Sequence, residues 1–440
     1  MASGVVYDAN LTRSDVLVLK NIEADIYNHR HEETLDASGD GDAPKSRAGT
    51  APADRDDDDE ATVQTLRDLN NPKSEQFEPT VFTSWDLSTL NLNPFLDQWL
   101  LRPYVRAARG LLRVETDVVM LTHLMLYLTT SVPSAAYLFL GGGGGFNWVH
   151  GLLHAAMQIS YMGSYTLMMH QHIHMRGILH RRLAWIDALF PYLTDPLMGH
   201  SWNSYFYHHV KHHHVEGNGP GDLSSTMRYQ RDDICHFLRY VGRFYFLVWL
   251  DLPLYFFRKR KPLLAAKVMF WEWGFCASLY LLYTVNPRAT TCVFLIPFFL
   301  LRAGLMVGNW GQHAFVDNVE PDSDYRSSIT LIDVPSNRHC FNDGYHTSHH
   351  LNPMRHWRDH PAAFVKAKKL YASHDALVFH EIDYIMITVR LMMKDYDTLA
   401  RRMVPIGDQI GLSMKERAEM LRSRTRQFTA EEMREKYNLT

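Results

Sequence analysis

Apolar residues are concentrated in four stretches in the middle of the chain. Each stretch has the length of a membrane-spanning helix, about 20 residues. The stretches are 117–140, 147–169, 264–284 and 288–308. Five glycines at 141–145 separate the first two, and Asn-Pro-Arg at 286–288 separates the last two. The pattern therefore predicts an all-α integral membrane protein whose four transmembrane helices form two hairpins.

Basic residues on the connections predict the orientation of these spans. They precede the first span, follow the second and precede the third, and are Arg102, Arg106, Arg109, Arg113, Arg176, Arg181, Arg182, Arg258, Lys259, Arg260 and Lys261. The two short turns carry only Arg288. Because cytosolic connections are enriched in Lys and Arg, we expect both termini and all long connections to be cytosolic. The long connections would then form a cytosolic helical cap over the spans.

The N-terminal region, residues 1–80, is polar and poor in aromatic residues, and it contains the acidic run "DRDDDDE" at 54–60. Such a segment buries too little apolar surface to offset its ordering entropy. We therefore expect disorder around 31–65. No apolar segment follows Met1, so a cleaved signal peptide is not expected. Residues 81–116 are predicted to be a cytosolic or interfacial lead-in.

Two further segments are expected to be helical outside the spans. Residues 240–258 are apolar but contain Asp251 and Pro253, and we expect this segment to lie in the membrane interface rather than to cross. Residues 376–440 are predicted to be a cytosolic helical tail. Its amphipathic start favours either the membrane surface or the cytosolic domain as its packing partner.

Composition excludes some classes of function and directs attention to histidine. The chain has 440 residues and a net charge of −3, which gives no electrostatic case for nucleic acid binding. Its four cysteines show no CxxC spacing, so neither a disulfide framework nor a zinc ribbon is indicated. Histidine is abundant, with 25 residues, and these include dense clusters near the predicted spans.

Four polar groups, three of histidines and one of Asn with His, lie beside the predicted spans on the same predicted face. They are "HQHIH" at 170–174, "HHVKHHH" at 208–214, "NWGQH" at 309–313 and "HTSHH" at 346–350. Within each group, residues recur at i, i+3 or i+4, positions that share one face of an α-helix. So many imidazoles exceed the needs of one four-coordinate zinc. The pattern predicts a site for two metal ions, and neutral imidazole suits iron, copper or zinc.

The ordered motifs HxxxH, HxxHH, NxxxH and HxxHH resemble those of the membrane-bound fatty-acid desaturase and hydroxylase superfamily over about 117–375. The resemblance implies a di-iron enzyme that uses O₂. It implies as metal ligands His170, His174, His209, His212, His213, His313, His346, His349 and His350. It also implies that Asn309 assists a metal through water, and we expect His208 and His214 to lie just outside the ligand shell.

The chain departs from the family pattern in three respects. The second motif also fits HxxxHH, as His208/His212/His213 or His209/His213/His214, a spacing similar to that of alkane hydroxylases, so its register stays open. The last motif begins with His346 rather than the glutamine of front-end desaturases. No HPGG haem motif is present, which implies a separate electron donor that is cytochrome b5-like or ferredoxin-like. A docking patch for it is expected at the basic residues Arg176, Arg181, Arg182 and Lys211, whose charges the orientation signal explains equally well.

Two ionisable residues lie inside predicted spans, where charge is costly. Glu272 and Arg302 are at similar depths in the third and fourth spans, roughly 12 and 9 Å from the cytosolic ends at about 1.5 Å per residue. We therefore predict a buried Glu272–Arg302 ion pair. The alternative is that Arg302 extends to the interface.

The resemblance favours a desaturase that introduces a double bond into a fatty acyl chain or similar lipid taken from the bilayer. The alternative is a hydroxylase or oxygenase of an acyl chain, alkane or other hydrophobic substrate. A membrane metal-binding or transport protein is disfavoured, because transport sites lie near mid-bilayer whereas these groups lie at span ends. By analogy with the family, the expected membrane is the endoplasmic reticulum.

Overall fold

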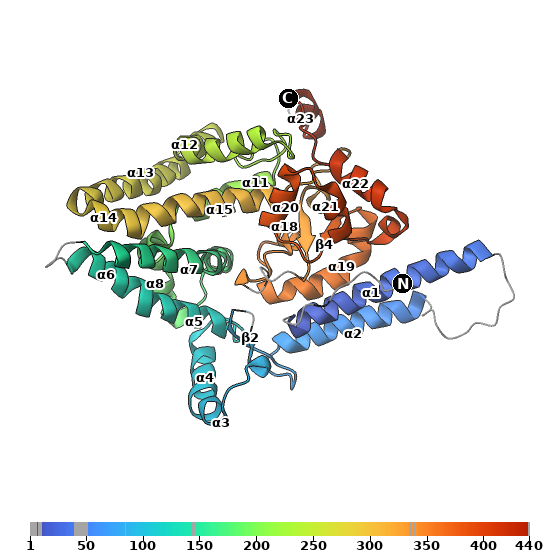
Figure 1. Ribbon diagram of the computed structural model, residues 1–440, viewed down its shortest axis with the longest axis horizontal. Coiled ribbons are helices and arrows are strands. Elements are labelled where there is room, and N and C mark those ends of the chain that lie inside the picture. The colour runs from blue at the N-terminus through green and yellow to red at the C-terminus, as the bar shows by residue number, and fades with distance from the viewer. Residues whose placement is uncertain are drawn as a thin grey trace.

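The computed structural model describes residues 7, 11–38, 52–83, 85–141, 146–333, 337 and 339–438. Figure 1 shows the helices α7, α13 and α15 on one side of the molecule, and the N-terminal helices α1 and α2 with the C-terminal elements on the other. The elements on the first side are α5 (Val118–Leu126), α6 (Val132–Leu140), α7 (Trp148–Met175), α12 (Ile234–Arg258), α13 (Pro262–Val285), α14 (Pro287–Thr290) and α15 (Ile296–Gln312). π-helical turns at Tyr127–Ser131 and Thr291–Leu295 join α5 to α6 and α14 to α15.

Among the described residues, three continuous helical segments are long and apolar enough to cross a membrane. They are Val118–Leu140, Pro262–Val285 and Pro287–Gln312. They coincide with the predicted spans 117–140, 264–284 and 288–308. The outward side chains on these helices include Leu140, Leu281 and Val285, which are 84%, 63% and 80% exposed. Apolar surface of this kind belongs against lipid rather than water.

The predicted span 147–169 lies within α7 but is not one of the three segments, because polar residues such as Gln158 and Ser164 lower its hydropathy. A fourth span therefore stays a prediction. Residues 142–145 of the glycine turn lie outside the described residues. The segment 240–258 falls in α12, which folds back on α13 after Arg260, and Trp273 Nε1 donates to Trp249 O at 3.1 Å. Its interfacial position also stays a prediction.

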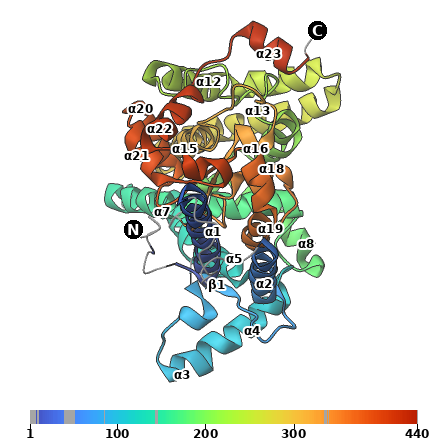
Figure 2. The same cartoon turned by 90° about the vertical axis from the view of Figure 1, so that its right-hand side faces the viewer.

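Of the segment 31–65, in which we expect disorder, residues 31–38 and 52–65 lie in helices, while 39–51 lie outside the described residues. Helix α1 is Arg13–Ser38 and α2 is Pro52–Asn70. The acidic run 54–60 lies in the first turns of α2, where the helix dipole favours negative charge. Figure 2 shows α1 and α2 in front of α19 (His360–Ser373). Apolar side chains of the three helices share one core. The acidic run itself contributes no apolar burial, but the apolar residues after it in α2 and those of α1 and α19 do.

A lysine holds this N-terminal pair of helices to the rest of the protein. Lys368 Nζ of α19 lies 2.6 Å from Asp25 Oδ2 of α1 and 2.5 Å from Asp59 Oδ1 of α2. It also donates to Asn21 Oδ1 at 2.9 Å. The side chain of Lys368 is only 11% exposed, so Asp59 of the acidic run helps to neutralise a buried cation.

The lead-in, residues 81–116, contains β2 (Trp85–Asp86), which pairs with β1 (Thr80–Phe82), and then α3 (Pro94–Leu96), a π-helical turn (Asp97–Leu101) and α4 (Arg102–Leu111). In Figure 2, α3 and α4 extend away from the body of the protein. Phe95, Trp99 and Leu100 are about two-thirds exposed and lie next to basic Arg102. This pattern fits an interfacial position, which remains a prediction.

The cap is helical apart from a small sheet that the all-α expectation misses. Strand β4 (Leu377–Phe379) pairs in parallel with β3 (Ile329–Leu331) and antiparallel with β5 (Met403–Val404). Each strand is two or three fully buried residues, apolar except for Thr330, and is too short to show strand periodicity in the sequence. The other elements of the cap and of the connection after α7 are α8 (Ala184–Asp187), α9 (Phe190–Leu193), α10 (Ser204–His208), α11 (His214–Glu216), α16 (Asp324–Ser327), α18 (His346–Leu351), α20 (Tyr384–Met392), α21 (Tyr396–Arg402), α22 (Met414–Ser423) and α23 (Ala430–Lys436).

The described part of the C-terminal segment, residues 376–438, packs within the cap. Its helices α20, α21 and α22 share a core with the sheet, which includes Ile387, Leu399 and Leu421. Of the two packing partners left open by the sequence, the described residues show packing on the cap itself. Helix α20 also packs on the end of α15, which fixes the cap against the membrane helices.

Candidate metal centre

The histidine motifs lie on short elements at one end of the long helices. His170 and His174 are one turn apart at the end of α7, which stops where Arg176 and Gly177 adopt positive φ of 58° and 121°. His313 follows the last turn of α15, and His346, His349 and His350 lie on α18. Helix ends from distant parts of the sequence therefore meet under the cap.

The second motif does not continue as an α-helix. After α10, residues His209–His213 form a π-helical turn, and α11 begins at His214. A π-helix has i→i+5 hydrogen bonds, so residues i, i+4 and i+5 share a face instead of i, i+3 and i+4. The turn therefore directs His209, His213 and His214 to one side and His212 to another.

Nine imidazoles gather into two groups, within each of which the candidate ligand atoms lie within 4.8 Å of one another. The first histidine group is His170, His174, His209, His214 and His349. The second histidine group is His213, His313, His346 and His350. The groups adjoin, since the ring centroids of His214 and His350 are 5.2 Å apart.

The prediction that His212 joins the ligands is not supported by this geometry, and His214 takes its place. His212 Nε2 accepts a hydrogen bond from the Leu223 backbone N–H at 3.1 Å, and its ring packs edge-on against Tyr255. An α-helical projection gives a different register, because one extra residue is accommodated in the π-helical turn. The open HxxxHH register His209/His213/His214 is the one that the fold brings together.

In three of the four imidazoles of the second group, Nδ1 faces an oxygen atom. His213 Nδ1 lies 2.8 Å from Asp222 Oδ2, His313 Nδ1 lies 2.7 Å from Ser327 O, and His350 Nδ1 lies 3.4 Å from Asp324 Oδ1. Such partners fix the tautomer and orientation of a metal-binding imidazole. In the first group, His170 Nδ1 faces Asp343 Oδ1 at 3.7 Å.

Burial favours the neutral form of several of the clustered imidazoles. Removal from water, together with neighbouring imidazoles, lowers the pKa of His209, His214 and His349 well below the ordinary value. His346 behaves in the same way for the same reasons. A neutral imidazole has a lone pair available for a metal, so the lowered pKa of these four imidazoles favours metal binding.

The contacts within the first group fit a bound cation. Four Nε2 atoms form a closed ring, with distances of 2.8 Å (His170–His209), 3.0 Å (His209–His214), 2.9 Å (His214–His349) and 3.1 Å (His349–His170). Each Nε2 carries either one proton or one lone pair, so at most two of these four contacts are hydrogen bonds. Nitrogens bound at about 2.1 Å and at right angles around one metal lie about 3.0 Å apart.

An unpaired nitrogen supports the same conclusion. His174 Nε2 belongs to a 96%-buried side chain and has no hydrogen-bond partner among the described residues. A buried polar atom of this kind is costly unless something binds it. The donor set, five imidazoles beside four, therefore fits two transition-metal ions.

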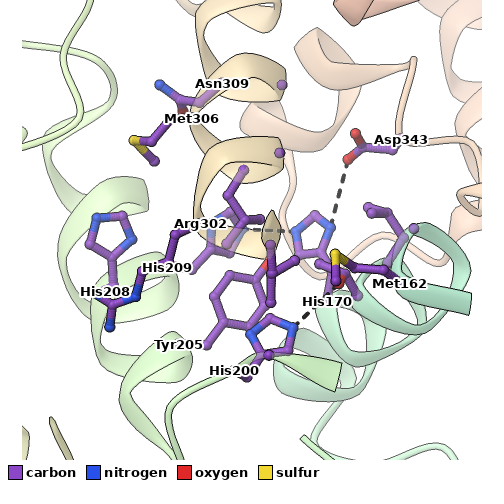
Figure 3. A pocket seen from close by; sticks show the side chains of 18 of the residues that line it. Met162, His170, His200, Tyr205, His208, His209, Arg302, Met306, Asn309 and Asp343 are labelled. Atoms are coloured by element: carbon purple, nitrogen blue, oxygen red, sulfur yellow. Dashed lines mark hydrogen bonds and ion pairs between the residues drawn. The ribbon is translucent and has the colours of Figure 1, made fainter. Parts of the chain in front are cut away.

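A cavity of about 410 Å³ lies next to both groups. His170 and His209 of the first group and His213 and His346 of the second contribute to its wall. Figure 3 shows several of the lining side chains, with His170 between His209 and Asp343. Its size is in the range of ligand-binding pockets, and much of its wall is apolar, including Ile159, Leu167, Val248, Leu252, Leu301 and Leu305.

The other expected site residues also lie at this cavity. Asn309 lines it and donates through Nδ2 to Ser224 O at 3.0 Å and Tyr240 Oη at 2.7 Å. His208 lines it outside both groups. The predicted ion pair forms, because Arg302 Nη2 lies 3.0 Å from Glu272 Oε2 and both side chains are under 10% exposed.

The helices and histidines together define a helical membrane protein with groups of imidazoles that could hold metal ions. The model of the family described as fatty acid desaturase matches residues 127–381, more than half of the chain, so the chain belongs to this family. No curated protein and no solved structure matches the chain.

The sequence interpretation missed the oxygen partners of the histidines. Asp222 follows the second motif closely, and an acidic residue just after a histidine motif is a usable signal. Asp324 and Asp343 carry no such signal, because only the folded chain brings them beside His350 and His170.

Proposed function

We propose that the protein is a di-iron, O₂-dependent desaturase that introduces a double bond into a fatty acyl chain or similar lipid. The single observation that supports this most is the pair of adjoining histidine groups beside an apolar cavity. Membership of the fatty acid desaturase family supports the same reaction class. The overall balance is a saturated C–C unit, O₂, two electrons and two protons giving a double bond and two waters.

The ligands in this proposal are the nine members of the two groups, and Asn309 assists through water. Two irons bound there would supply the oxidising power that C–H cleavage needs and that side chains lack. The protein supplies position. Asp222 keeps the proton of His213 on Nδ1 and its Nε2 lone pair free, and the Ser327 carbonyl does the same for His313.

The cavity wall determines which carbons approach the site. Leu301 and Leu305 of α15 and Ile159 of α7 contribute apolar surface, which holds a hydrocarbon chain and excludes water. Because a misplacement of about 1 Å can cost about 10²-fold in rate, this wall decides the position of the double bond.

A hydroxylase is the second candidate, and one observation favours it. The histidines that gather are His209, His213 and His214, which have the HxxxHH spacing noted above for alkane hydroxylases. Product mass separates the two reactions, because desaturation removes two hydrogens whereas hydroxylation adds one oxygen.

The external electrons are proposed to come from a separate cytochrome b5-like or ferredoxin-like protein. Arg176, Arg181, Arg182 and Lys211 are all exposed, and they follow the first motif or interrupt the second, so an acidic donor docked there would lie close to the histidine groups. The proposal places the protein in the endoplasmic reticulum membrane with its histidines on the cytosolic side.

The test uses purified full-length protein and a host that expresses it. We expect about two irons per chain, O₂ consumption that requires reductant, and host lipids two mass units lighter than their precursors. The matched control is His349→Ala, which removes one proposed ligand. Lipid masses that are identical in the wild type and this variant, for protein that carries iron, would contradict the proposal.

A further inference from the structure

The cavity contains a buried cation whose hydrogen-bonding capacity is largely unused. Arg302 lines the cavity and is 8% exposed. A guanidinium has five N–H donors, and the hydrogen bond from Nη2 to Glu272 Oε2 is the only one that Arg302 makes among the described residues. Its other donors are therefore available to whatever occupies the cavity.

The carboxylate of the pair is already satisfied. One oxygen of Glu272 accepts from Arg302, and the other accepts from Ser201 Oγ at 2.7 Å. Ser201 in turn contacts Ser204 Oγ at 2.5 Å. The pair therefore presents the unused N–H donors of Arg302 to the cavity, and Glu272, which also lines the cavity, orients the guanidinium and cancels its charge.

Aromatic rings and a second polar group surround Arg302. Its Cζ lies 4.2 Å from the Phe298 ring centroid and 5.9 Å from that of Phe244. Phe244 also lies 5.3 Å from the ring of His208, whose buried Nε2 has no hydrogen-bond partner among the described residues. Arg302, His208 and the first group's His209 all line the same cavity (Figure 3).

This arrangement suits a neutral oxygen atom. A plain hydrocarbon would leave the buried donors of Arg302 without partners, which is unfavourable. A carboxylate would bring a second negative charge beside Glu272 at low dielectric. A hydroxyl or carbonyl oxygen accepts from Arg302 without adding charge.

We propose that Arg302, oriented by Glu272, binds a neutral hydroxyl or carbonyl oxygen of an otherwise apolar chain in the cavity beside the histidine groups. The substrate class is then an oxygenated aliphatic chain, such as an alcohol or an ester, rather than an alkane or a free fatty acid. This inference rests on the proposed function for the reaction, but the binding itself needs no turnover.

The experiment compares binding of three probes of equal chain length to purified full-length protein: 1-dodecanol, dodecane and dodecanoate. Bound probe is measured by mass spectrometry after equilibrium dialysis. One charge-assisted hydrogen bond corresponds to roughly 10- to 100-fold in affinity. We expect 1-dodecanol to bind more tightly than the other two by about that factor.

The test variant is the double substitution Arg302→Met/Glu272→Leu, which removes both charges and leaves no buried ion unpaired. We expect it to bind 1-dodecanol and dodecane equally. The control is Arg243→Met/Asp251→Leu, which removes an ion pair of 2.9 Å on α12 that does not line the cavity and should keep the preference for the alcohol.

Equal binding of all three probes by the wild type would overturn the inference and would mean that only water occupies the donors. The comparison of the three probes uses only the wild type, so it tests the inference even if the double variant fails to fold. Selective binding of 1-dodecanol with no oxidation of any chain would support the binding role of Arg302 and count against the proposed function. Oxidation of a chain without selective binding of 1-dodecanol would support the proposed function and count against the binding role of Arg302.

Discussion

The two histidine groups adjoin each other but are held in different ways. In the second group, three of four imidazoles have an oxygen within 3.4 Å of Nδ1, from Asp222, Asp324 or the Ser327 carbonyl. In the first group, an acidic oxygen lies within 4 Å of one described imidazole, that of His170, at 3.7 Å.

The difference shows how each group obtains its geometry. The second group is oriented by partners outside it, so its lone pairs point inward before any ion arrives. The first group is positioned by backbone, namely the end of α7, the π-helical turn and α18. Changes to the backbone register should therefore affect the first group most, and changes to the carboxylates should affect the second.

The largest expected effect comes from the π-helical turn. Substituting His214→Ala removes a member of the first group, and we expect activity to fall by at least about 10²-fold together with iron content. The control His212→Ala removes a neighbouring histidine from the same motif, and we expect the metal content and most of the activity to be retained. Iron per chain and lipid product are the measurements.

His212→Ala should still lose some stability, about 1 kcal/mol, because the Leu223 N–H loses its acceptor. If His212→Ala loses iron and His214→Ala retains it, the α-helical register is correct and the grouping described above is wrong.

The second prediction concerns the carboxylate partners. Asp222→Asn places an amide opposite His213 Nδ1 while an oxygen remains for Ser224, and we expect metal affinity of the second group to fall about 10- to 100-fold. Asp343→Asn should have a smaller effect on the first group, because its contact to His170 is 3.7 Å rather than 2.8 Å. Titration with a chelator, counting the ions lost, measures both. A larger loss for Asp343→Asn would reverse the comparison.

Whether a feature of the fold or of the metal centre can be predicted from the sequence depends on how far apart in the chain the interacting residues lie. Three spans and the positions of most histidines follow from local patterns, and the Glu272–Arg302 pair follows from helix lengths. The register of the second histidine motif does not follow from local patterns, because one residue accommodated in a π-helical turn leaves no trace in the sequence pattern. The partners Asp324 and Asp343 are brought to their histidines only by the tertiary fold.

The sequence predictions for the N-terminal region and for the small sheet differ from the structure for a related reason. An acidic run predicts disorder when it is judged alone, but Lys368 of α19 contributes the opposite charge from the other end of the chain. The strand Leu377–Phe379 is three apolar residues long, and only its pairing with the two neighbouring strands identifies it as a strand.

The smallest predicted effect is a difference in pH dependence between the carboxylates of the two groups. Burial raises the pKa of Asp343 to about 7, although a hydrogen bond from Gln312 opposes this. Burial would also raise the pKa of Asp222, but His213 and His212 hold it well below the ordinary value. Near neutral pH, Asp343 therefore titrates in the folded state and Asp222 stays ionised.

The sign of the effect follows from which state binds the proton. Between about pH 4, where an unfolded aspartate ionises, and about pH 7, folded Asp343 holds a proton that the unfolded chain has lost. The metal-free wild type should therefore lose stability relative to Asp343→Asn as pH rises through this window, by at most about 1.4 kcal/mol per pH unit. Asp222→Asn should show no such relative change there. Thermal unfolding of the metal-free proteins at pH 5.5, 6.5 and 7.5 measures the differences, and parallel curves for the wild type and Asp343→Asn would mean that the carboxylate beside the first group is ionised throughout, like the one beside the second.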